Sequence, residues 1–243
     1  MLAGLLLIIA VLYSAVGHAG ASGYIAAMTL SGLPVQDIRP SALALNLVVG
    51  SIGLFRFARA GQVPRRSVLP LVAASAPMAW VGARLALPAH VYGWALGGLL
   101  IASALAFWVT APKALAADDT VLPRVPVLPG LAVGAAIGLL SGITGTGGAI
   151  FLTPLLIFLR WAPTRMASGI SVAFVLANSL LGLAGLLSTG AALSSSLPLW
   201  IAAVVIGALI GTQLGIRVLP VGPLRRVLSV VLLIAAGKLI LTS

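Results

Sequence analysis

The 243-residue chain has no cysteine and no glutamate, and its only acidic residues are Asp37, Asp118 and Asp119. Without cysteine it forms neither disulfides nor thiolate metal sites. All three aspartates fall in predicted loops, so the apolar segments contain no carboxylate of the kind that relays protons or coordinates cations in cation-coupled transporters. A path lined by hydroxyl and amide groups suits an anion or a neutral solute better.

Charged residues of any kind are scarce, at 7% of the chain, whereas 61% is hydrophobic. Apolar runs of eighteen or more residues recur along nearly the whole sequence, which indicates a polytopic helical membrane protein. The net charge of +11 comes from basic residues that stand mostly at the ends of these runs. Basic residues in such places orient a protein in the lipid bilayer, so we do not expect nucleic acid as a partner.

Enzyme motifs are also missing. The sequence has no HExxH, no phosphate-binding P-loop and no aspartate pair within an apolar segment. We therefore expect no enzymatic activity, no catalytic residues, no cofactor and no metal site. Without a nucleotide site, any transport is secondary or passive, unless a separate subunit supplies the energy.

The apolar runs divide into eight segments, arranged as two homologous halves. The first repeat covers residues 1–111, a polar linker 112–126, and the second repeat 127–243. The short stretch Pro34–Pro40 is expected to be a loop. The segments are approximately Leu2–Leu33, Ser41–Phe57, Val68–Leu87, Val91–Thr110, Val127–Leu159, Met166–Leu187, Leu197–Val218 and Leu224–Leu241.

Two glycine-rich breaks organise these halves. Gly17–Gly23 and Gly142–Gly148 both read G-x-x-G-x-[SG]-G, and a shift of 125 positions superposes them. Glycine inside a helix costs about 1 kcal/mol relative to alanine. Freed backbone groups are tolerated in a bilayer only where protein or a water-filled cavity satisfies them. A broken helix in each half is the best pointer in a sequence to a transport site.

The basic residues discriminate between two topologies for the broken segments. If all eight segments cross the membrane, seven basic residues fall on each face. If the two broken segments instead enter and return on one side, eleven fall on one face, and the other keeps Arg39, Arg84 and Lys238. Eleven against three is a positive-inside pattern for a multi-pass protein of the cytoplasmic (inner) membrane. We therefore predict re-entrant hairpins and inverted repeats; the alternative is a long, kinked helix that spans fully.

Two inverted breaks would aim two helix N-termini, with their free N–H groups, at one central point, which makes an anion cradle mostly from backbone. The bland alternative is that small residues let membrane helices pack closely. The predicted substrate-binding residues are Gly17, His18, Gly20, Ser22 and Gly23 of the first break, Gly142, Thr144, Gly145, Thr146, Gly147 and Gly148 of the second, and Asn46, Ser168, Ser171 and Asn178 of neighbouring segments.

Two of the candidates, His18 and Arg84, have two readings each. His18 is either a ligand coupled to protonation, since imidazole titrates near physiological pH, or a hydrogen-bonded structural residue. Arg84 and its counterpart Gln213 fall near helix ends, where either could contact an anion. For Arg84 the simpler interpretation is a residue whose stem lies along apolar surface while its charge reaches the membrane interface.

The stretch Gly142-x-x-Gly145-x-Gly147-Gly148, followed by Leu152-Thr153-Pro154-Leu155, resembles the TauE/SafE sulfite-exporter family, also called toluene-sulfonate-uptake permeases. The Gly61 turn and the Gly82-Ala83-Arg84 element are similar too. The resemblance covers essentially the whole chain, and it implies a carrier for sulfite, sulfonates or related sulfur-containing anions. The first repeat departs from the pattern, with Ser22 in place of Gly147 and Thr29 in place of Pro154.

The hypothesis that follows is a secondary transporter of small sulfur-containing anions, working by alternating access of the two repeats. The alternatives are a passive anion channel and a non-transporting membrane accessory protein. The expected partners are the anion, the lipid bilayer and a coupling ion, either a proton or sodium. The sequence leaves the direction of transport open, and also whether the chain forms a homodimer.

Overall fold

The computed structural model describes residues 1–85, 88–115 and 123–217, together with residues 226, 229, 230, 233, 236 and 237. Within these residues the regular structure is entirely α-helical. Four helices are long and apolar enough to cross a membrane: Gln36–Arg59, Val127–Thr144, Thr164–Leu187 and Leu197–Gly215. The predicted all-α membrane protein is thus confirmed. Most of the eighth predicted segment, Leu224–Leu241, lies outside the described residues.

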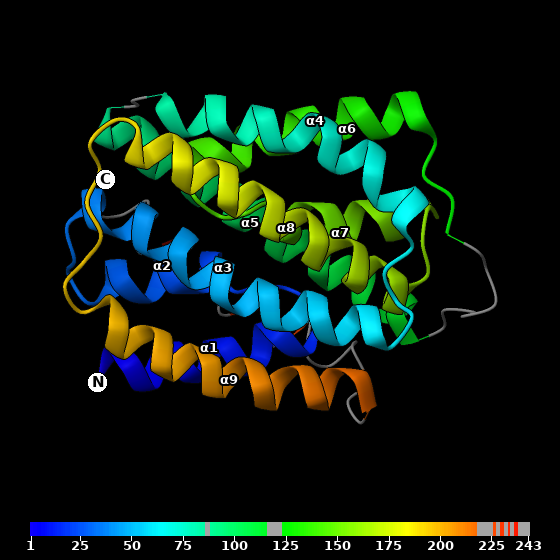
Figure 1. Ribbon diagram of the computed structural model, residues 1–243, viewed down its shortest axis with the longest axis horizontal. Helices are drawn as coiled ribbons and strands as arrows, with labels where there is room; N and C mark the ends of the chain where they lie inside the picture. Colours follow the sequence, from blue (N-terminus) through cyan, green and yellow to red (C-terminus); the bar gives the residue numbers. More distant parts are fainter. Residues whose placement is uncertain are drawn as a thin grey trace.

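Each broken segment folds as two helices. The first gives α1 (Leu2–Ala15) and α2 (Ala21–Leu30), and the second gives α6 (Val127–Thr144) and α7 (Ala149–Phe158) (Figure 1). Gly20 and Gly148, which directly precede α2 and α7, have φ values of +103° and +85°. Backbone of this left-handed kind favours glycine because other residues meet steric strain there. The breaks are therefore set by the glycines themselves.

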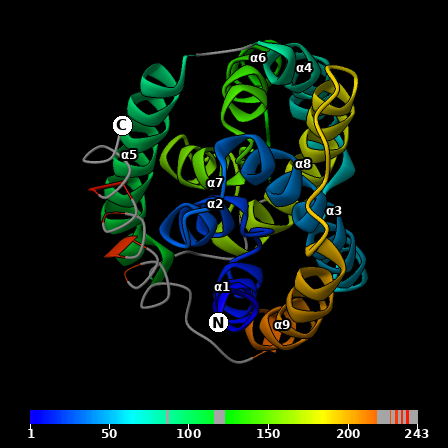
Figure 2. The ribbon, with the colours of Figure 1, turned by 90° about the vertical axis from the view of Figure 1, so that its left-hand side faces the viewer.

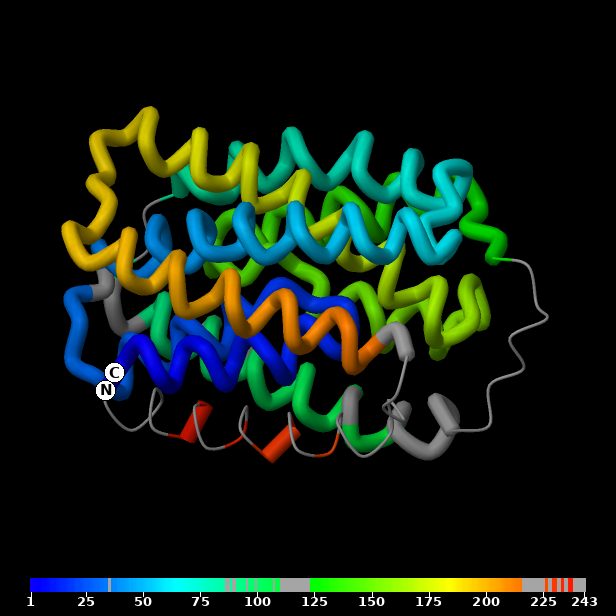
Figure 3. The backbone as a smooth tube through the Cα atoms, turned by 60° about the horizontal axis from the view of Figure 1, so that its bottom comes forward, coloured from blue at the N-terminus to red at the C-terminus, as the bar shows by residue number. Residues whose placement is uncertain are grey.

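At each break the chain reverses direction. Gly23 of α2 packs against Ile9 and Tyr13 of α1, so α2 returns along the helix that precedes it. At the second break, Gly148 packs against Ile137 of α6. The tube in Figure 3 shows α1 and α6 entering the bundle from opposite ends, with α2 and α7 each running back towards the end of entry.

The other described helices, together with α1 and α6, surround α2 and α7 (Figure 2). These other helices are α3 (Val35–Arg59), α4 (Arg65–Arg84), α5 (Ala89–Leu115), α8 (Thr164–Leu187) and α9 (Leu197–Arg217). In the end view of Figure 2, α2 and α7 lie at the centre of the bundle. The main helix pairs are α4 with α6, α1 with α9, α4 with α8, α3 with α8 and α3 with α9. If α1, α2, α3 and α4 are exchanged in order with α6, α7, α8 and α9, the same set of pairs results, as inverted repeats require. The repeat relation itself and the bounds of the two repeats stay a prediction.

Two glycine faces hold the hairpins against their neighbours. Gly134, Gly138 and Gly142 of α6 lie on backbone carbonyls of α4, namely those of Leu71, Ser75 and Ala79. Gly207, Gly211 and Gly215 of α9 lie in the same way on carbonyls of α1. A side chain at any of these six positions would collide with backbone, so the helices approach each other through small residues at every fourth position. Gly142 therefore has a role in close helix packing, which was the alternative to substrate binding for the glycines of the breaks.

The observed helices differ from the expected segments at two boundaries. The stretch Pro34–Pro40 is not a loop, because α3 begins at Val35 and carries Arg39 in its second turn. Helix α5 continues to Leu115, so its last turn lies inside the segment 112–126 that was expected to be a polar linker. The first difference matters for function, because it places a basic residue inside the helical bundle.

The described arginines are distributed very unevenly between the two ends of the bundle. One end holds the turn from α3 to α4, the start of α6 and the turn from α7 to α8 (right in Figure 1). The opposite end holds only Arg39 and Arg84 among the described arginines in helices and turns up to residue 165. The arginines at the basic end are Arg56, Arg59, Arg65, Arg66, Arg124, Arg160 and Arg165.

Candidate functional site

The side chain of Asn46 joins the two glycine breaks. Its Oδ1 accepts a hydrogen bond of 2.9 Å from the backbone N–H of Ala21, the first residue of α2. Its Nδ2 donates to Ser179 of α8 at 3.1 Å, and the same nitrogen would lie 2.5 Å from a Cβ added to Gly147. Asn46 is completely buried. The neutral carboxamide of Asn46 thus lies between the start of α2 and the segment that leads into α7.

Around the second break, the site is made by α8. Gly147 has a φ of +77° and packs on Val175 and Ser179. Asn178 is fully buried, and its Nδ2 donates to the carbonyl of Gly147 at 3.4 Å. Its Oδ1 has no hydrogen-bond partner within the described part of the chain. Burying such an oxygen without a partner costs free energy, and a group of this kind marks a place where a ligand or water is expected.

Around the first break, the contact with α8 is made by Ser168. Its hydroxyl donates to the carbonyl of Val16 at 2.8 Å, and a Cβ on Gly17 would lie 2.8 Å from the Cα of Ser168. Helix α8 therefore touches the first break through Ser168 and the second through Asn178. Because one helix contacts both breaks, a shift of α8 changes both at once.

His18 lies inside the first break and is buried. Its Nδ1 is 3.2 Å from the carbonyl of Val16, and its ring meets that of Tyr13 edge-on, with centroids 6.4 Å apart. The hollow next to it, lined by Ser14, Val172 and Thr212 among others, has no room for a molecule the size of water. These contacts fit the structural reading of His18, and the ligand reading stays a prediction.

Two buried tyrosines complete the first break. Ser22 donates to the hydroxyl of Tyr13 at 3.1 Å. Gly20 leaves room for the ring of Tyr24, because a Cβ on Gly20 would lie 2.8 Å from the tyrosine hydroxyl oxygen. That hydroxyl has no hydrogen-bond partner among the described residues, although Tyr24 is fully buried. The break therefore holds a free hydroxyl donor beside the start of α2.

The remaining predicted residues of the second break make a hydroxyl cluster. The hydroxyl oxygens of Thr144 and Thr146 are 2.9 Å apart, and Thr144 also donates to the carbonyl of Leu140. The hydroxyl of Tyr92 on α5 donates to the carbonyl of Thr144 at 2.9 Å. Gly145, which ends α6 with a φ of +77°, lies under the side chain of Arg39.

Three predicted contacts lie away from the centre of the site. Ser171 pairs with Thr153 of α7 at 2.6 Å, one turn from Ser168 on α8. Arg84 is exposed at the end of α4, with its guanidinium 4.4 Å from the centre of the Trp80 ring. Gln213 is exposed on α9. The structure thus brings neither Arg84 nor Gln213 to the breaks, and the exposure of Arg84 fits the interfacial interpretation.

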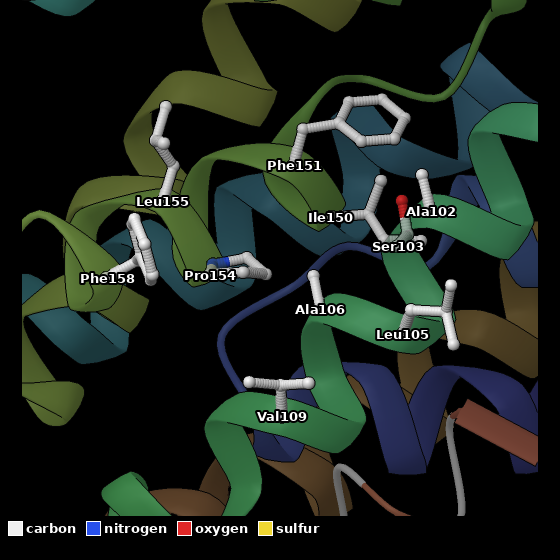
Figure 4. Close-up of a pocket in the computed structure, with 10 residues that line it drawn as sticks. All are labelled: Ala102, Ser103, Leu105, Ala106, Val109, Ile150, Phe151, Pro154, Leu155 and Phe158. Carbon is white, nitrogen blue, oxygen red and sulfur yellow. The ribbon is translucent and has the colours of Figure 1, made fainter.

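A second hollow in the structure is of a different kind. It is a groove of about 390 Å³ between α5 and α7 (Figure 4). Apolar side chains such as Leu105, Phe151 and Phe158 line it, and Ser103 supplies its one hydroxyl. An anion gains nothing from such a lining, whereas a lipid chain fits it. The groove is therefore not part of the candidate site.

Several residues of the site escaped sequence reasoning: Tyr13, Tyr24, Arg39, Tyr92 and Ser179. Arg39 was assigned to a loop, and no tyrosine was among the predicted site residues. Ser179 could have been found, because it directly follows Asn178, which was chosen for its spacing on the same helix.

The long apolar helices around two broken, oppositely directed hairpins define the class, a multi-pass α-helical membrane transporter. The family model of the sulfite exporter TauE/SafE matches residues 2–239, so the chain belongs to the TauE/SafE family. The chain is also 40% identical over 233 residues to the probable membrane transporter protein y4hK of Sinorhizobium fredii, an alignment that covers 96% of this chain and 94% of the relative. No solved structure matches the chain.

Proposed function

We propose that the chain is a secondary transporter of small sulfur-containing anions such as sulfite and sulfonates, working by alternating access. The observation that carries the proposal is the position of Asn46 between the two breaks, with Ala21 on one side and Gly147 on the other. Broken helices that meet in this way form the substrate sites of many secondary transporters. The name of the family gives the sulfur anion as the first candidate substrate.

The chemistry of the breaks favours an anion over a cation. The free N–H groups at the start of α2 carry the positive end of the helix dipole. In this structure the Ala21 N–H is bonded by the neutral Oδ1 of Asn46, which occupies the place that an oxyanion oxygen would take. The hydroxyl of Tyr24 is a second donor at the same break. None of the described side chains that line the breaks is a carboxylate.

The opposite directions of the two hairpins support the proposal of alternating access. The hairpin α1–α2 opens to one end of the bundle and α6–α7 to the other (Figure 3). We propose that an anion displaces the Asn46 side chain and is passed from one break to the other as α8 shifts between them. A coupling proton would be carried by His18 or by the substrate itself, and a coupling sodium ion would need carbonyl and hydroxyl oxygens.

Counterflow in proteoliposomes tests the function. Purified protein is reconstituted, and the uptake of labelled sulfite and labelled methanesulfonate is measured with and without unlabelled anion inside the vesicles. A carrier is expected to accelerate labelled uptake several-fold when the inside is loaded, because the loaded site returns faster than the empty one. Uptake that is unaffected by internal anion would instead establish a passive channel. Absence of any flux for both anions, with folded protein, would contradict the proposed substrate class.

The proposed topology places the basic end of the bundle in the cytoplasm, as the positive-inside rule requires. Single cysteines test it, since the natural chain has none. Ala60 in the turn from α3 to α4 and Ser195 in the turn from α8 to α9 are both exposed, at opposite ends of the bundle. We expect Ser195→Cys to react with a membrane-impermeant maleimide in intact cells and Ala60→Cys only after lysis. Reaction of both from the same side would indicate eight full crossings.

A further inference from the structure

We propose that Arg39 is an anion-binding residue of the second break, which contacts the negatively charged group of the substrate at the end of the bundle opposite the basic one. The inference deepens the proposed anion transport and rests on it. Arg39 lies in the second turn of α3, half-buried, with its Cβ and Cγ 3.3 Å from where a Cβ on Gly145 would stand. The stem of Arg39 therefore lies beside the point where α6 ends, and its Nη2 reaches back to the carbonyl of Gly142.

The hydrogen bonds of Arg39 use only some of the N–H donors of its guanidinium. Its Nη2 donates to the carbonyl of Gly142 at 2.9 Å and, more weakly, to that of Ala83 at 3.3 Å. Its charge also lies 5.6 Å from the centre of the Tyr92 ring. Its Nε is buried, yet it has no hydrogen-bond partner in the part of the chain that the structure describes. One donor edge of the guanidinium is thus left for another acceptor.

Within the described ranges, the charge of Arg39 also has no counter-ion. Among the described residues no carboxylate pairs with it, and Asp37 is the only aspartate in those ranges. An arginine within a membrane segment is costly, and such residues normally pair with an opposite charge or mark a substrate path. Arginine is suited to oxyanions because its planar N–H groups match their oxygens in pairs. A sulfite or sulfonate oxygen on Nε supplies both the missing acceptor and the missing charge.

A purely structural role accounts for less. A cation at the C-terminal end of a helix is favourable, and Arg39 does bond the last carbonyls of α6 and α4. That role explains the hydrogen bonds that Nη2 donates, but it does not explain why Nε is buried without a partner among the described residues. It also does not explain why one of only two described arginines at this end of the bundle stands at this position. The other one, Arg84, is exposed and stacked on Trp80, which makes it a matched control for loss of one positive charge.

The experiment compares Arg39→Gln, Arg39→Lys and Arg84→Gln with the natural protein. Two readouts are measured: the half-saturating concentration of methanesulfonate in counterflow, and the rise in melting temperature of the detergent-purified protein on adding methanesulfonate. We expect Arg39→Gln to raise the half-saturating concentration about ten- to hundred-fold, the effect of losing a charge-assisted hydrogen bond, and to lose the anion-dependent stabilisation. Arg39→Lys, which keeps the charge and loses Nε, should fall between, and Arg84→Gln should match the natural protein.

The outcomes separate this inference from the proposed function. Unchanged half-saturation in both Arg39 variants, even with a lower melting temperature, would assign Arg39 a structural role and overturn the inference while transport stands. Anion-dependent stabilisation that requires Arg39, without exchange in the natural protein, would support the anion site and overturn the carrier. Neither stabilisation nor exchange in the natural protein would overturn both. If Arg39→Gln does not fold, the half-saturating concentrations of Arg39→Lys and Arg84→Gln are compared instead. A higher value in Arg39→Lys supports the inference, and equal values overturn it.

Discussion

Replacing Gly147 with alanine is expected to abolish anion exchange. The added Cβ would lie 2.5 Å from Nδ2 of Asn46 and closer still to Val175, so the Asn46 side chain has to leave the position in which it joins the breaks. The left-handed backbone at Gly147 adds strain of about 1–3 kcal/mol for any other residue. Counterflow of labelled methanesulfonate is the measurement, with the folded state checked by size-exclusion chromatography and the melting temperature.

Substitutions at two other glycines distinguish the steric effect of the Gly147→Ala side chain from the effect of backbone strain. Gly190, in the turn from α8 to α9, has a φ of +86°, and a Cβ there would meet nothing within 4 Å. Gly190→Ala thus carries the same kind of strain far from the breaks, and we expect it to exchange anions normally. Gly145→Ala would place a Cβ 3.3 Å from the flexible side chain of Arg39, so a partial loss is expected. Equal exchange by the Gly147 and Gly190 variants would remove the second break from the transport path.

The positions of the breaks followed from local chemistry and were predictable from the sequence. Dense clusters of glycine favour a break in a helix, because glycine loses more conformational freedom on folding than other residues and tolerates positive φ. The spacing of Ser168, Ser171 and Asn178 likewise placed them on one side of a helix. The structure adds that this helix, α8, touches both breaks. The whole fold decides which helices are in contact, so these contacts cannot be predicted from a local sequence pattern.

Arg39 shows where local signals conflicted. Pro40 and Pro34 enclose a polar stretch, which favours a loop. However, Asp37 follows Pro34 in the manner of a helix start, where acidic residues are favourable, and the helix does begin there. For Arg84 the simpler interpretation from the sequence was an interfacial residue, and its exposed position beside Trp80 fits that interpretation.

The tyrosines of the site were not predictable, because each acts through a partner distant in the sequence or through its burial. Tyr92 of α5 bonds the carbonyl of Thr144, more than fifty residues away, and Tyr13 accepts a hydrogen bond from Ser22 across the first break. In a membrane protein a tyrosine near a segment end is more often an interfacial anchor. Only the packing of the bundle distinguishes the buried ones.

Asn46→Asp is the other substitution with a large expected effect, and it tests the sign of the charge that the site accepts. The aspartate can still accept the hydrogen bond from Ala21 N–H, and the hydroxyl of Ser179 can turn to donate to it. The fold is therefore expected to survive, whereas a negative charge now stands between the two breaks. Two like charges 4 Å apart at an effective dielectric of about 20 repel by about 4 kcal/mol, which corresponds to a loss of about a thousand-fold in anion binding.

The measurement is counterflow of methanesulfonate at pH 8, where the ionised carboxylate is favoured, with Gln62→Glu as the control. Gln62 lies in the turn from α3 to α4, so its variant adds the same charge to the same protein outside the breaks. Near-complete loss in Asn46→Asp, with normal exchange in Gln62→Glu, would place the anion path at Asn46. Normal exchange in both would contradict an anion path there, since no anion could pass that carboxylate at an unchanged rate. A gain of cation flux in Asn46→Asp would show that the same path accepts the opposite charge once the charge of its central side chain is reversed.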